Sequence, residues 1–378
     1  MDITYIAENI SIARAGVATV VRDLFNVFST DKEVNVEILT TVNDGKILPL
    51  YSNNIRCFPA SGSWRYSKEL RTYLENKAYK PGVLWHIHGV WLYPMHAASK
   101  IAVKKKVPYI MTIHSMLFPW HLRRKWWKLI PYFKLIEKKH LKNASCIHAI
   151  TKQERDHLKA LVPALKNIEV IPNSIDPDYF FEKPDTDGLI GMFPQLKDRP
   201  VVLFVGRLHP QKSVQELIEA WLTVVKKDKD HILFMVGPDQ IGLKQVMEQR
   251  IAEENASDRV IFAGHLSGGL KAAAYKQAKI FVSPAKFEVI GLTNLEAMCM
   301  KIPLLTTRET GLEDIERYGS GRFTTSNPDE IAASLLSMIS MTDNELNEMG
   351  EKGRKMVEDI YSIEKTSAQM KDLYKSLI

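Results

Sequence analysis

The sequence predicts an α/β fold of two doubly wound parallel-sheet domains that face each other across a cleft. At 378 residues the chain is too long for a single hydrophobic core, so two domains of ordinary size are expected. Short apolar runs alternate with helical patterns along the whole chain, which is typical of βαβ units. The run Val201–Val205 is entirely apolar, as in a strand buried on both faces of a parallel sheet.

In the first half, short apolar runs predict seven strands, and apolar residues at helical spacing predict four helices. The first helix, over 17–28, is indicated by Val17, Val21, Leu24 and Phe28 on one stripe. The strands are expected at 3–6, 36–39, 55–58, 83–88, 109–113, 146–150 and 168–171, and the other helices at 94–105, 123–143 and 152–162.

The second half repeats this scheme after a polar stretch over 176–187 that carries several Asp and Pro. We therefore predict a first domain over 1–170 and a second domain over 171–361. The strands are expected at 201–205, 232–236, 260–262, 280–282 and 304–306, and the helices at 214–227, 242–254, 268–277, 291–300, 328–340, 343–358 and 362–377.

The composition is that of a globular protein with reduced thiols. Three scattered cysteines, Cys57, Cys146 and Cys299, favour a cytoplasmic compartment. Asp2 and Glu8 interrupt the N-terminal apolar run, so no signal peptide is predicted, and no run approaches the length of a membrane span.

The net charge of +7 belongs to one segment, residues 120–142. This segment holds eight basic residues and one acid, so the remaining chain has equal numbers of both signs. The basic residues are Arg123, Arg124, Lys125, Lys128, Lys134, Lys138, Lys139 and Lys142, and the acid is Glu137. Together with Trp120, Trp126 and Trp127 they predict either contact with an anionic membrane or a solvated helix whose tryptophans pack on the core. Nucleic acid is the weaker alternative because no binding module for it is present.

A candidate anion site lies in residues 281–298, where a strand, a short loop and a helix follow one another. The helix is expected to begin near Gly291, and its first N–H groups and dipole favour an anion such as a diphosphate. Glu288 and Glu296 flank this site and suit the hydroxyls at the two ends of a nucleotide sugar. The alternative is a surface glutamate and a capping glutamate on an ordinary helix.

Two cations are expected at the same edge of the sheet, because Arg207 and Lys212 follow the strand 201–205. With a helix N-terminus they can neutralise a leaving diphosphate without a metal. The alternative is a solvated basic loop. Backbone groups near Pro238 and Leu266, at two further strand ends, suit a nucleobase or form plain turns.

In the first domain, Ala15-Gly16 follows the first strand and allows close approach to a diphosphate. No G-x-G-x-x-G motif occurs, so NAD binding is not supported. The strand 83–88 ends in His86 and His88, and a histidine at a strand end can orient an acceptor hydroxyl or bind the donor phosphate. His114 is the better candidate because it lies just past the strand 109–113, whereas His86 is expected to be structural. Three Asp-x-Asp triplets, at 176, 185 and 228, fall in expected linkers and are interpreted as solvated turns, with no metal.

Taken together, these motifs resemble those of the family-four retaining glycosyltransferases with the two-domain GT-B fold. They follow the order of the family along nearly the whole chain. The residues that carry the resemblance are Ala15-Gly16, Thr112-Ile113-His114, Ile171-Pro172-Asn173-Ser174-Ile175-Asp176, Gly206-Arg207 with Lys212, Val236-Gly237-Pro238, Glu288, and Gly291-Leu292 with Leu295-Glu296-Ala297-Met298. Ala15, Ser174 and Ser213 depart from the pattern at positions where relatives often have Gly.

The resemblance implies two Rossmann-like domains, no metal and no cofactor, and a last helix, 362–378, that joins the first domain. It also implies a role for each of the candidate site residues. Glu288 contacts the donor sugar and Glu296 the ribose; Arg207 and Lys212 hold the diphosphate with the N–H groups of Leu292 and Thr293 beside Gly291; the backbone near Pro238 and Leu266 holds the base; His114 lies by the reacting sugar; and Gly16 lines the first-domain wall. His114, Glu288, Arg207 and Lys212 form the implied catalytic set.

The function expected from the sequence is retaining transfer of a sugar from a UDP-sugar to a glycan or lipid-linked acceptor, as in cell-surface or exopolysaccharide assembly. UDP-glucose is the first candidate donor, because the family often uses it. The enzyme is expected in the cytoplasm, alone or in peripheral contact with the inner face of the membrane through 120–142, and without a nucleic-acid partner. The alternatives are a nucleotide-sugar epimerase of the same fold and an inactive nucleotide-sugar binder.

Overall fold

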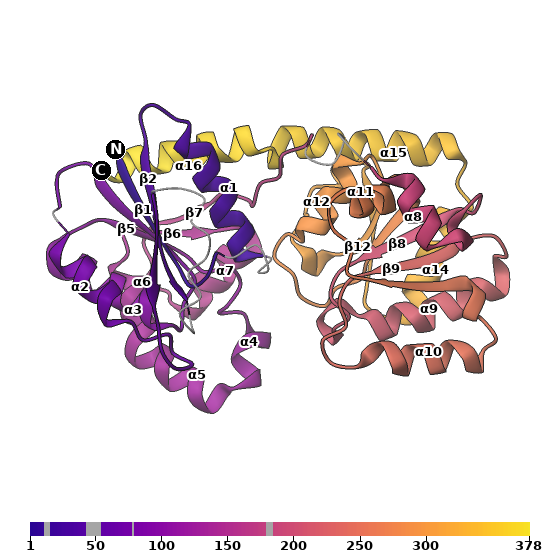
Figure 1. Cartoon of the computed structure of the whole chain (residues 1–378), viewed down its shortest axis with the longest axis horizontal. Helices are drawn as coiled ribbons and strands as arrows, with labels where there is room; N and C mark the ends of the chain where they lie inside the picture. Colours follow the sequence, from indigo (N-terminus) through magenta and orange to yellow (C-terminus); the bar gives the residue numbers. More distant parts are fainter. Residues whose placement is uncertain (11–15, 43–53, 78, 179–183) are drawn as a thin grey trace. The chain divides into compact units, whose positions relative to one another are not determined.

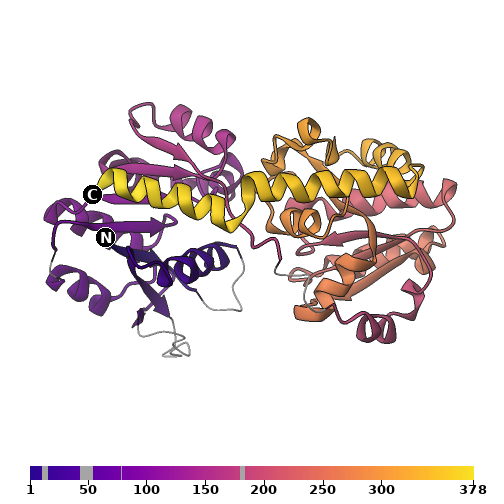
Figure 2. The ribbon, with the colours of Figure 1, turned by 90° about the horizontal axis from the view of Figure 1, so that it is seen from above.

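The computed structural model describes residues 1–10, 16–42, 54–77, 79–178 and 184–378. The chain forms two compact units, one of Met1–Asn173 with Glu364–Ile378 and one of Ser174–Ile363. The predicted boundary, after residue 170, lies three residues earlier. Both ends of the chain lie on the first unit, near one another (Figures 1 and 2).

The first unit is built on a seven-stranded parallel sheet in the order β3-β2-β1-β4-β5-β6-β7. The order reverses between β1 and β4, as in a doubly wound sheet. The strands are β1 Asp2–Ala7, β2 Asn35–Val42, β3 Ile55–Pro59, β4 Val83–His88, β5 Tyr109–Thr112, β6 Cys146–Ala149 and β7 Ile168–Val170.

Helices cover both faces of this sheet (Figure 1). The buried stripe of α1, which includes Val21 and Leu24, packs on one face together with Tyr374 from the last helix. On the other face, Leu70, Met95 and Leu158 pack from three different helices against the sheet. The helices are α1 Val17–Ser29 and α16 Ile363–Leu377 on the first face, and α2 Lys68–Asn76, α3 Tyr93–Lys105, α6 Lys138–Asn143 and α7 Lys152–Leu161 on the second.

The second unit has a six-stranded parallel sheet in the order β10-β9-β8-β11-β12-β13. Its strands are β8 Val201–Val205, β9 Ile232–Val236, β10 Val260–Gly264, β11 Ala278–Ser283, β12 Leu304–Thr307 and β13 Gly321–Thr324. Its helices are α8 Thr186–Met192, α9 Val214–Lys227, α10 Leu243–Glu253, α11 Gly268–Gln277, α12 Leu292–Cys299, α13 Ile315–Tyr318, α14 Pro328–Ile339 and α15 Asp343–Met356.

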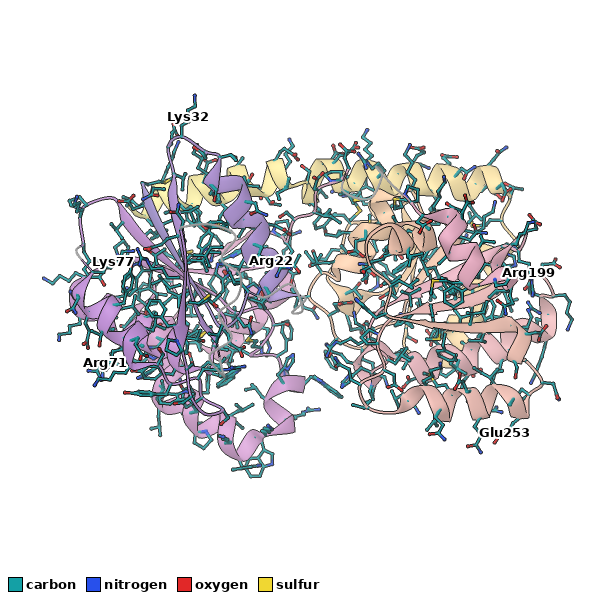
Figure 3. All side chains as sticks on the ribbon, in the orientation of Figure 1. Arg22, Lys32, Arg71, Lys77, Arg199 and Glu253 are labelled. Carbon is teal, nitrogen blue, oxygen red and sulfur yellow. The ribbon has the colours of Figure 1, made fainter. Side chains whose placement is uncertain are left out.

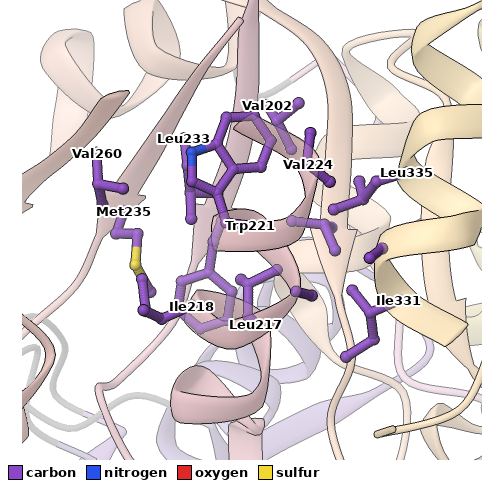
Figure 4. Close-up of a cluster of buried hydrophobic side chains, with 14 of the residues drawn as sticks. Val202, Leu217, Ile218, Trp221, Val224, Leu233, Met235, Val260, Ile331 and Leu335 are labelled. Carbon is purple, nitrogen blue, oxygen red and sulfur yellow. The ribbon is translucent and has the colours of Figure 1, made fainter. Parts of the chain in front are cut away.

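The core of the second unit surrounds Trp221 of α9, which is fully buried against the sheet (Figure 4). Its indole N–H donates to the backbone oxygen of Arg259 at 3.0 Å, so the large ring is buried without an unpaired donor. Ile331 and Leu335 of α14 close the same cluster. Outside the cores, charged side chains such as Lys32 and Glu253 project into solvent (Figure 3).

The two sheets confirm the predicted fold class, but several elements differ from the sequence analysis. The expected helix over 123–143 is broken into α4 Pro119–Arg124, α5 Trp126–Tyr132, a π-helical turn Phe133–Glu137 and α6. Lys125 has a non-helical backbone, with φ −140° and ψ 44°, which separates α4 from α5. From Trp126 onward the helix runs through Pro131 and changes to π-helical bonding at Phe133–Glu137. α2, α8, α13 and β13 were not predicted at all. No described helix has the length and apolar character that crossing a bilayer requires.

Candidate active site

The loops that follow the strands of the second sheet lie side by side, because all its strands are parallel and end at one edge. Backbone hydrogen bonds fix these loops to one another. Leu208 N donates to Pro238 O at 3.0 Å, and Gly237 N donates to Gly264 O at 2.7 Å. The segment that carries Arg207 is thereby held beside the segments after β9 and β10.

Gly237 is required for this close approach. Its φ is 150°, and a Cβ at this position would overlap the carbonyl oxygen of Gly206.

We expect Gly237→Ala to destabilise the second unit by roughly 3 kcal/mol or more, since only backbone movement can relieve the overlap. Urea unfolding would measure this loss. Gly242→Ala is the matched control: a Cβ there meets no atom within 4 Å, and its positive φ costs only about 1 kcal/mol. Equal losses in the two variants would contradict the steric argument.

Lys212 lies in the 3₁₀ turn Pro210–Lys212, just ahead of α9, and is only 9% exposed. Its Nζ donates to Oε1 of Glu288, in the loop between β11 and α12. The other oxygen, Glu288 Oε2, is buried and has no hydrogen-bond partner among the described residues. A buried unpaired carboxylate oxygen is costly, so this atom is suited to accept a hydrogen bond from a ligand hydroxyl.

The Glu288 carboxylate lies against Gly291, directly before α12. A Cβ at residue 291 would lie 2.5 Å from Glu288 Oε2, so the close contact requires glycine here. The N–H groups of Leu292 and Thr293 are the first of the helix and have no partners within it. A carboxylate, a lysine and a helix N-terminus therefore meet at this strand end.

The loop that carries Glu288 is held by backbone hydrogen bonds on both sides. Lys286 N donates to Gln211 O at 2.9 Å, in the turn that contains Lys212. Ile290 N donates to Thr310 O at 3.1 Å, in the loop after β12. The carboxylate is consequently fixed before any ligand arrives, which is the preorganisation that electrostatic catalysis uses.

Glu296 lies one turn further along α12 and is already paired. Its carboxylate accepts hydrogen bonds from Lys271 Nζ, at 2.7 and 2.8 Å, and from the hydroxyl of Tyr275, both on α11. Burial and the neighbouring Glu296 carboxylate raise the pKa of Tyr275 well above its usual value. A ribose hydroxyl at Glu296 would join or replace these bonds, which the sequence analysis did not foresee.

Arg207 is exposed and forms no ion pair with any residue that the structure describes. Its guanidinium is thus available to a ligand anion, unlike Lys212. Leu266, after β10, is buried, and its neighbour Gly264 carries the hydrogen bond to Gly237 described above.

In the first unit, His114 lies two residues past the end of β5 and adopts a left-handed φ of 52°. Its Nε2 lies 3.2 Å from Nδ1 of His88, and the two rings stack with centroids 5.4 Å apart. The buried carboxylate of Glu154 accepts the N–H of Ser115 at 2.6 Å and that of Ile150 at 2.7 Å. Glu154 therefore ties the His114 loop to the loop after β6 and holds its unusual backbone.

His114 belongs to a buried cluster of neutral histidines. His86 lies 2.6 Å from the hydroxyl of Thr112 and 2.8 Å from that of Tyr374, so both its ring nitrogens are partnered in the core. Thr112 also lies 2.8 Å from Nδ1 of His148. Burial lowers the pKa of His114 to about 3 and that of His148 to about 4, and lowers the pKa of His86 well below its usual value. His114 is hence an uncharged hydrogen-bonding group at neutral pH.

Gly16 caps the N-terminus of α1 with a φ of 74°, and its carbonyl accepts the N–H groups of Thr19 and Val20. Ala15, the other half of this motif, lies outside the described residues. Beside the start of α1, a cavity of about 370 Å³ opens where β1 and β4 end. Its lining includes Glu8, Ala18, His88, Trp91 and Met116.

No set of three or more His, Cys, Asp or Glu side chains within the described ranges is arranged to hold a metal. All three Asp-x-Asp triplets are more than the solvated turns that were predicted: Asp178 of the first pairs with Arg354 at 2.7 Å. Asp185 caps α8 by accepting Gly188 N, and Asp228 forms a buried ion pair with Arg259 at 2.9 Å.

Several residues that the structure brings to these sites were not predicted. They are Lys271, Tyr275 and Lys286 in the second unit, and His148 and Glu154 in the first. Lys271 and Tyr275 are four residues apart on one predicted helix, a spacing that could have indicated a shared face. Nothing local to Glu154 signals its contact with Ser115, 39 residues away.

Comparison with known proteins identifies the family of the chain. A family model described as Glycosyl transferases group 1 matches residues 192–356, and one described as Glycosyltransferase Family 4 matches residues 14–179. The chain belongs to the family-four glycosyltransferases with the GT-B fold. The Family 4 match covers most of the first unit, and the group 1 match lies within the second unit.

The curated relatives of this glycosyltransferase are distant. The alpha-D-kanosaminyltransferase of Streptomyces kanamyceticus is 24% identical over 287 residues, which cover 72% of each chain. The 2-deoxystreptamine N-acetyl-D-glucosaminyltransferase of Niallia circulans is 24% identical over 62% of this chain and 60% of its own, less than two thirds of its length.

Solved GT-B structures align with the glycosyltransferase along its whole length. Sucrose-phosphate synthase from Thermosynechococcus elongatus has a TM-score of 0.76 and 21% identity, and covers 100% of this chain and 98% of its own. HepE of Anabaena, in complex with UDP, has a TM-score of 0.76 at 16% identity and 100% coverage of both chains. At these identities the likeness confirms the fold and says nothing more specific.

Proposed function

We propose that this glycosyltransferase transfers a sugar, with glucose as the first candidate, from a UDP-sugar to a glycan or lipid-linked acceptor, with retention of anomeric configuration. The observation that carries the proposal is the buried, unpaired Glu288 Oε2 beside Lys212 and the start of α12. A hydroxyl-rich group next to an anion fits this arrangement. The neighbour HepE, whose structures contain UDP and UDP-glucose, supports the choice of donor.

In the proposed mechanism, negative charge grows on the diphosphate as the bond to the sugar breaks. Arg207, Lys212 and the N–H groups that begin α12 stabilise this charge, and they do so more strongly in the transition state than in the ground state. These groups supply the neutralisation that a metal would otherwise provide, so we propose a metal-independent reaction without a cofactor. The acceptor hydroxyl attacks from the leaving-group face and passes its proton to the departing phosphate, while neutral His114 serves as a hydrogen-bonding partner of the reacting sugar.

The proposed setting is the cytoplasm, in a pathway that assembles cell-surface glycans or exopolysaccharide. A lipid-linked acceptor would bring the enzyme to the inner face of the membrane, where the basic residues of 120–142 would lie close to anionic headgroups. Nucleic acid is not among the proposed partners.

Ligand-induced stabilisation tests the proposed donor. A nucleotide at about 100 times its Kd stabilises a protein by about 2.7 kcal/mol, which for a domain of this size raises Tm by roughly 5 °C or more. We expect UDP to give such a shift, larger than that with GDP or ADP, and Arg207→Ala to reduce it. Lys279→Ala, which removes an exposed pair with Asp343, should leave the shift unchanged. Absence of stabilisation by every nucleoside diphosphate would contradict the proposal.

Product analysis with the UDP-sugar then separates the alternatives. A transferase forms a new glycoside only when an acceptor is added, an epimerase forms an isomeric UDP-sugar without one, and an inactive binder is stabilised by UDP but forms neither product.

A further inference from the structure

The three most exposed large apolar side chains of the described chain all lie in one stretch of the first unit. Trp126, Trp127 and Leu135 are 62%, 67% and 79% exposed. They belong to α5 and the π-helical turn that follows it, and Ile130 between them is also exposed. Large apolar groups gathered in this way mark an interaction surface.

The charges around these side chains are of one sign. Arg123, Lys125, Lys128, Lys134, Lys139 and Lys142 are exposed, and none of them pairs with a carboxylate in the described parts of the chain. The only acid of the segment, Glu137, points inward: it is buried, and its Oε1 accepts the N–H of Trp91 at 2.9 Å. The solvent-facing side therefore presents only cations and apolar groups.

The opposite side of the segment is fixed to the domain. Phe133 and Leu141 are buried in the core of the first unit. The ring of Tyr132 lies 6.0 Å from Trp91 and 6.3 Å from Trp64, and the Trp64 indole donates to the Tyr132 hydroxyl at 3.3 Å. The exposed tryptophans are thus not needed for packing, and the packed aromatic residues are different ones.

The segment also adjoins the cavity at the ends of β1 and β4. Trp91 lines this cavity, and the same residue contacts both Tyr132 and Glu137. Trp91 therefore lies between α5 and a cavity at the carboxyl edge of the first sheet, so a surface that binds α5 would be close to this cavity.

We infer that residues 123–142 are an interfacial anchor for a bilayer with anionic headgroups. Trp126, Trp127 and Leu135 enter the headgroup region, and the surrounding lysines contact lipid phosphates. A bilayer fits better than a protein partner, because indole rings with unpaired cations suit the interface between hydrocarbon and anionic headgroups. Membrane binding itself does not depend on the proposed function. Only its purpose does: the anchor would bring a lipid-linked acceptor to the cavity beside Trp91.

Flotation of the full chain with vesicles tests this inference. We expect binding to vesicles of phosphatidylcholine with about one third phosphatidylglycerol at low salt, and little binding to phosphatidylcholine alone. Added salt should weaken the binding, because it screens the lysines. Absence of binding to the anionic vesicles at low salt would overturn the inference.

Two variants separate the apolar and electrostatic contributions. Trp126→Ser/Trp127→Ser/Leu135→Ser is expected to lower vesicle affinity at least tenfold, and Lys128→Glu/Lys134→Glu at least thirtyfold, since each cation near such a surface contributes strongly. Ile241→Ser/Val246→Ser is the matched control, because both side chains are more than half exposed but lie in the second unit, and it should bind like the parent.

Three further readouts complete the test. Retained far-UV circular dichroism and Tm show that the variants fold. Unchanged vesicle affinity in the serine variant would overturn the inference, because the binding would then be nonspecific. A concentration-dependent dimer that the serine variant abolishes together with vesicle binding would overturn it in favour of a self-association surface. Stabilisation by UDP is measured without vesicles, so failure of the proposed donor site and failure of the anchor are seen separately.

Discussion

Lys212→Ala is expected to lower turnover by about 10²- to 10³-fold, as the loss of one preorganised donor to a developing anion does in comparable sites. The same change leaves the largely buried Glu288 carboxylate without its cation. We therefore also expect a loss of roughly 1–3 kcal/mol in the free energy of unfolding, measured by urea titration.

The double variant Lys212→Ala/Glu288→Gln separates these two effects. A neutral amide at residue 288 no longer needs a cation, so most of the stability should return while turnover stays low. Lys279→Ala, in an exposed pair with Asp343, should change neither quantity. If the double variant regained turnover, Lys212 would act only by neutralising Glu288, and its proposed contact with the diphosphate would be wrong.

Mild acid is expected to unfold the first unit before the second. Burial lowers the pKa of His86, His88, His114, His140 and His148, so the folded unit does not bind the protons that an unfolded chain binds near pH 6.5. Stability is full above that pH and is lost as the pH falls from about 6.5 towards 4. At pH 5 each such histidine costs about 2 kcal/mol relative to pH 7.

Two buried carboxyls act in the opposite direction. Burial raises the pKa of Glu137 to about 7 and also raises that of Glu154, and proton uptake by these groups favours the folded state as the pH falls. They offset part of the loss contributed by the five histidines. A net loss of stability between pH 7 and pH 5 remains, because five histidines act against two carboxyls.

Tryptophan fluorescence during urea unfolding measures this effect, because six of the seven tryptophans lie in the first unit. All buried histidines of the described chain also lie there. His148→Asn keeps a hydrogen-bonding group but does not titrate, so it should reduce the pH dependence by about 2 kcal/mol. An unfolding free energy that stayed constant from pH 7 to pH 5 would show that the cluster does not govern acid stability.

The predicted fold followed from local patterns that the structure preserves. β4, β8 and β9 have the bounds expected from their apolar runs, and α9 has those expected from its helical period. The missed elements lack such signals. β13 is a four-residue edge strand whose central residues, Arg322 and Phe323, are only partly buried, and α8 lies in a polar stretch where Asp185 supplies the cap. The helical pattern over 123–143 continued through Lys125, where the backbone is not helical.

The sequence by itself determined the two parallel sheets, the edge at which their loops meet and the residue types gathered there, because hydrophobic periodicity and strand order depend on neighbours along the chain. Only the tertiary structure decided that Lys212 pairs with Glu288, that Lys271 pairs with Glu296, and that His114 is buried and neutral against His88. These pairings join residues 25 to 76 positions apart, and their charges depend on burial. Both distance and burial are set by how the strands and helices pack, which no local pattern specifies.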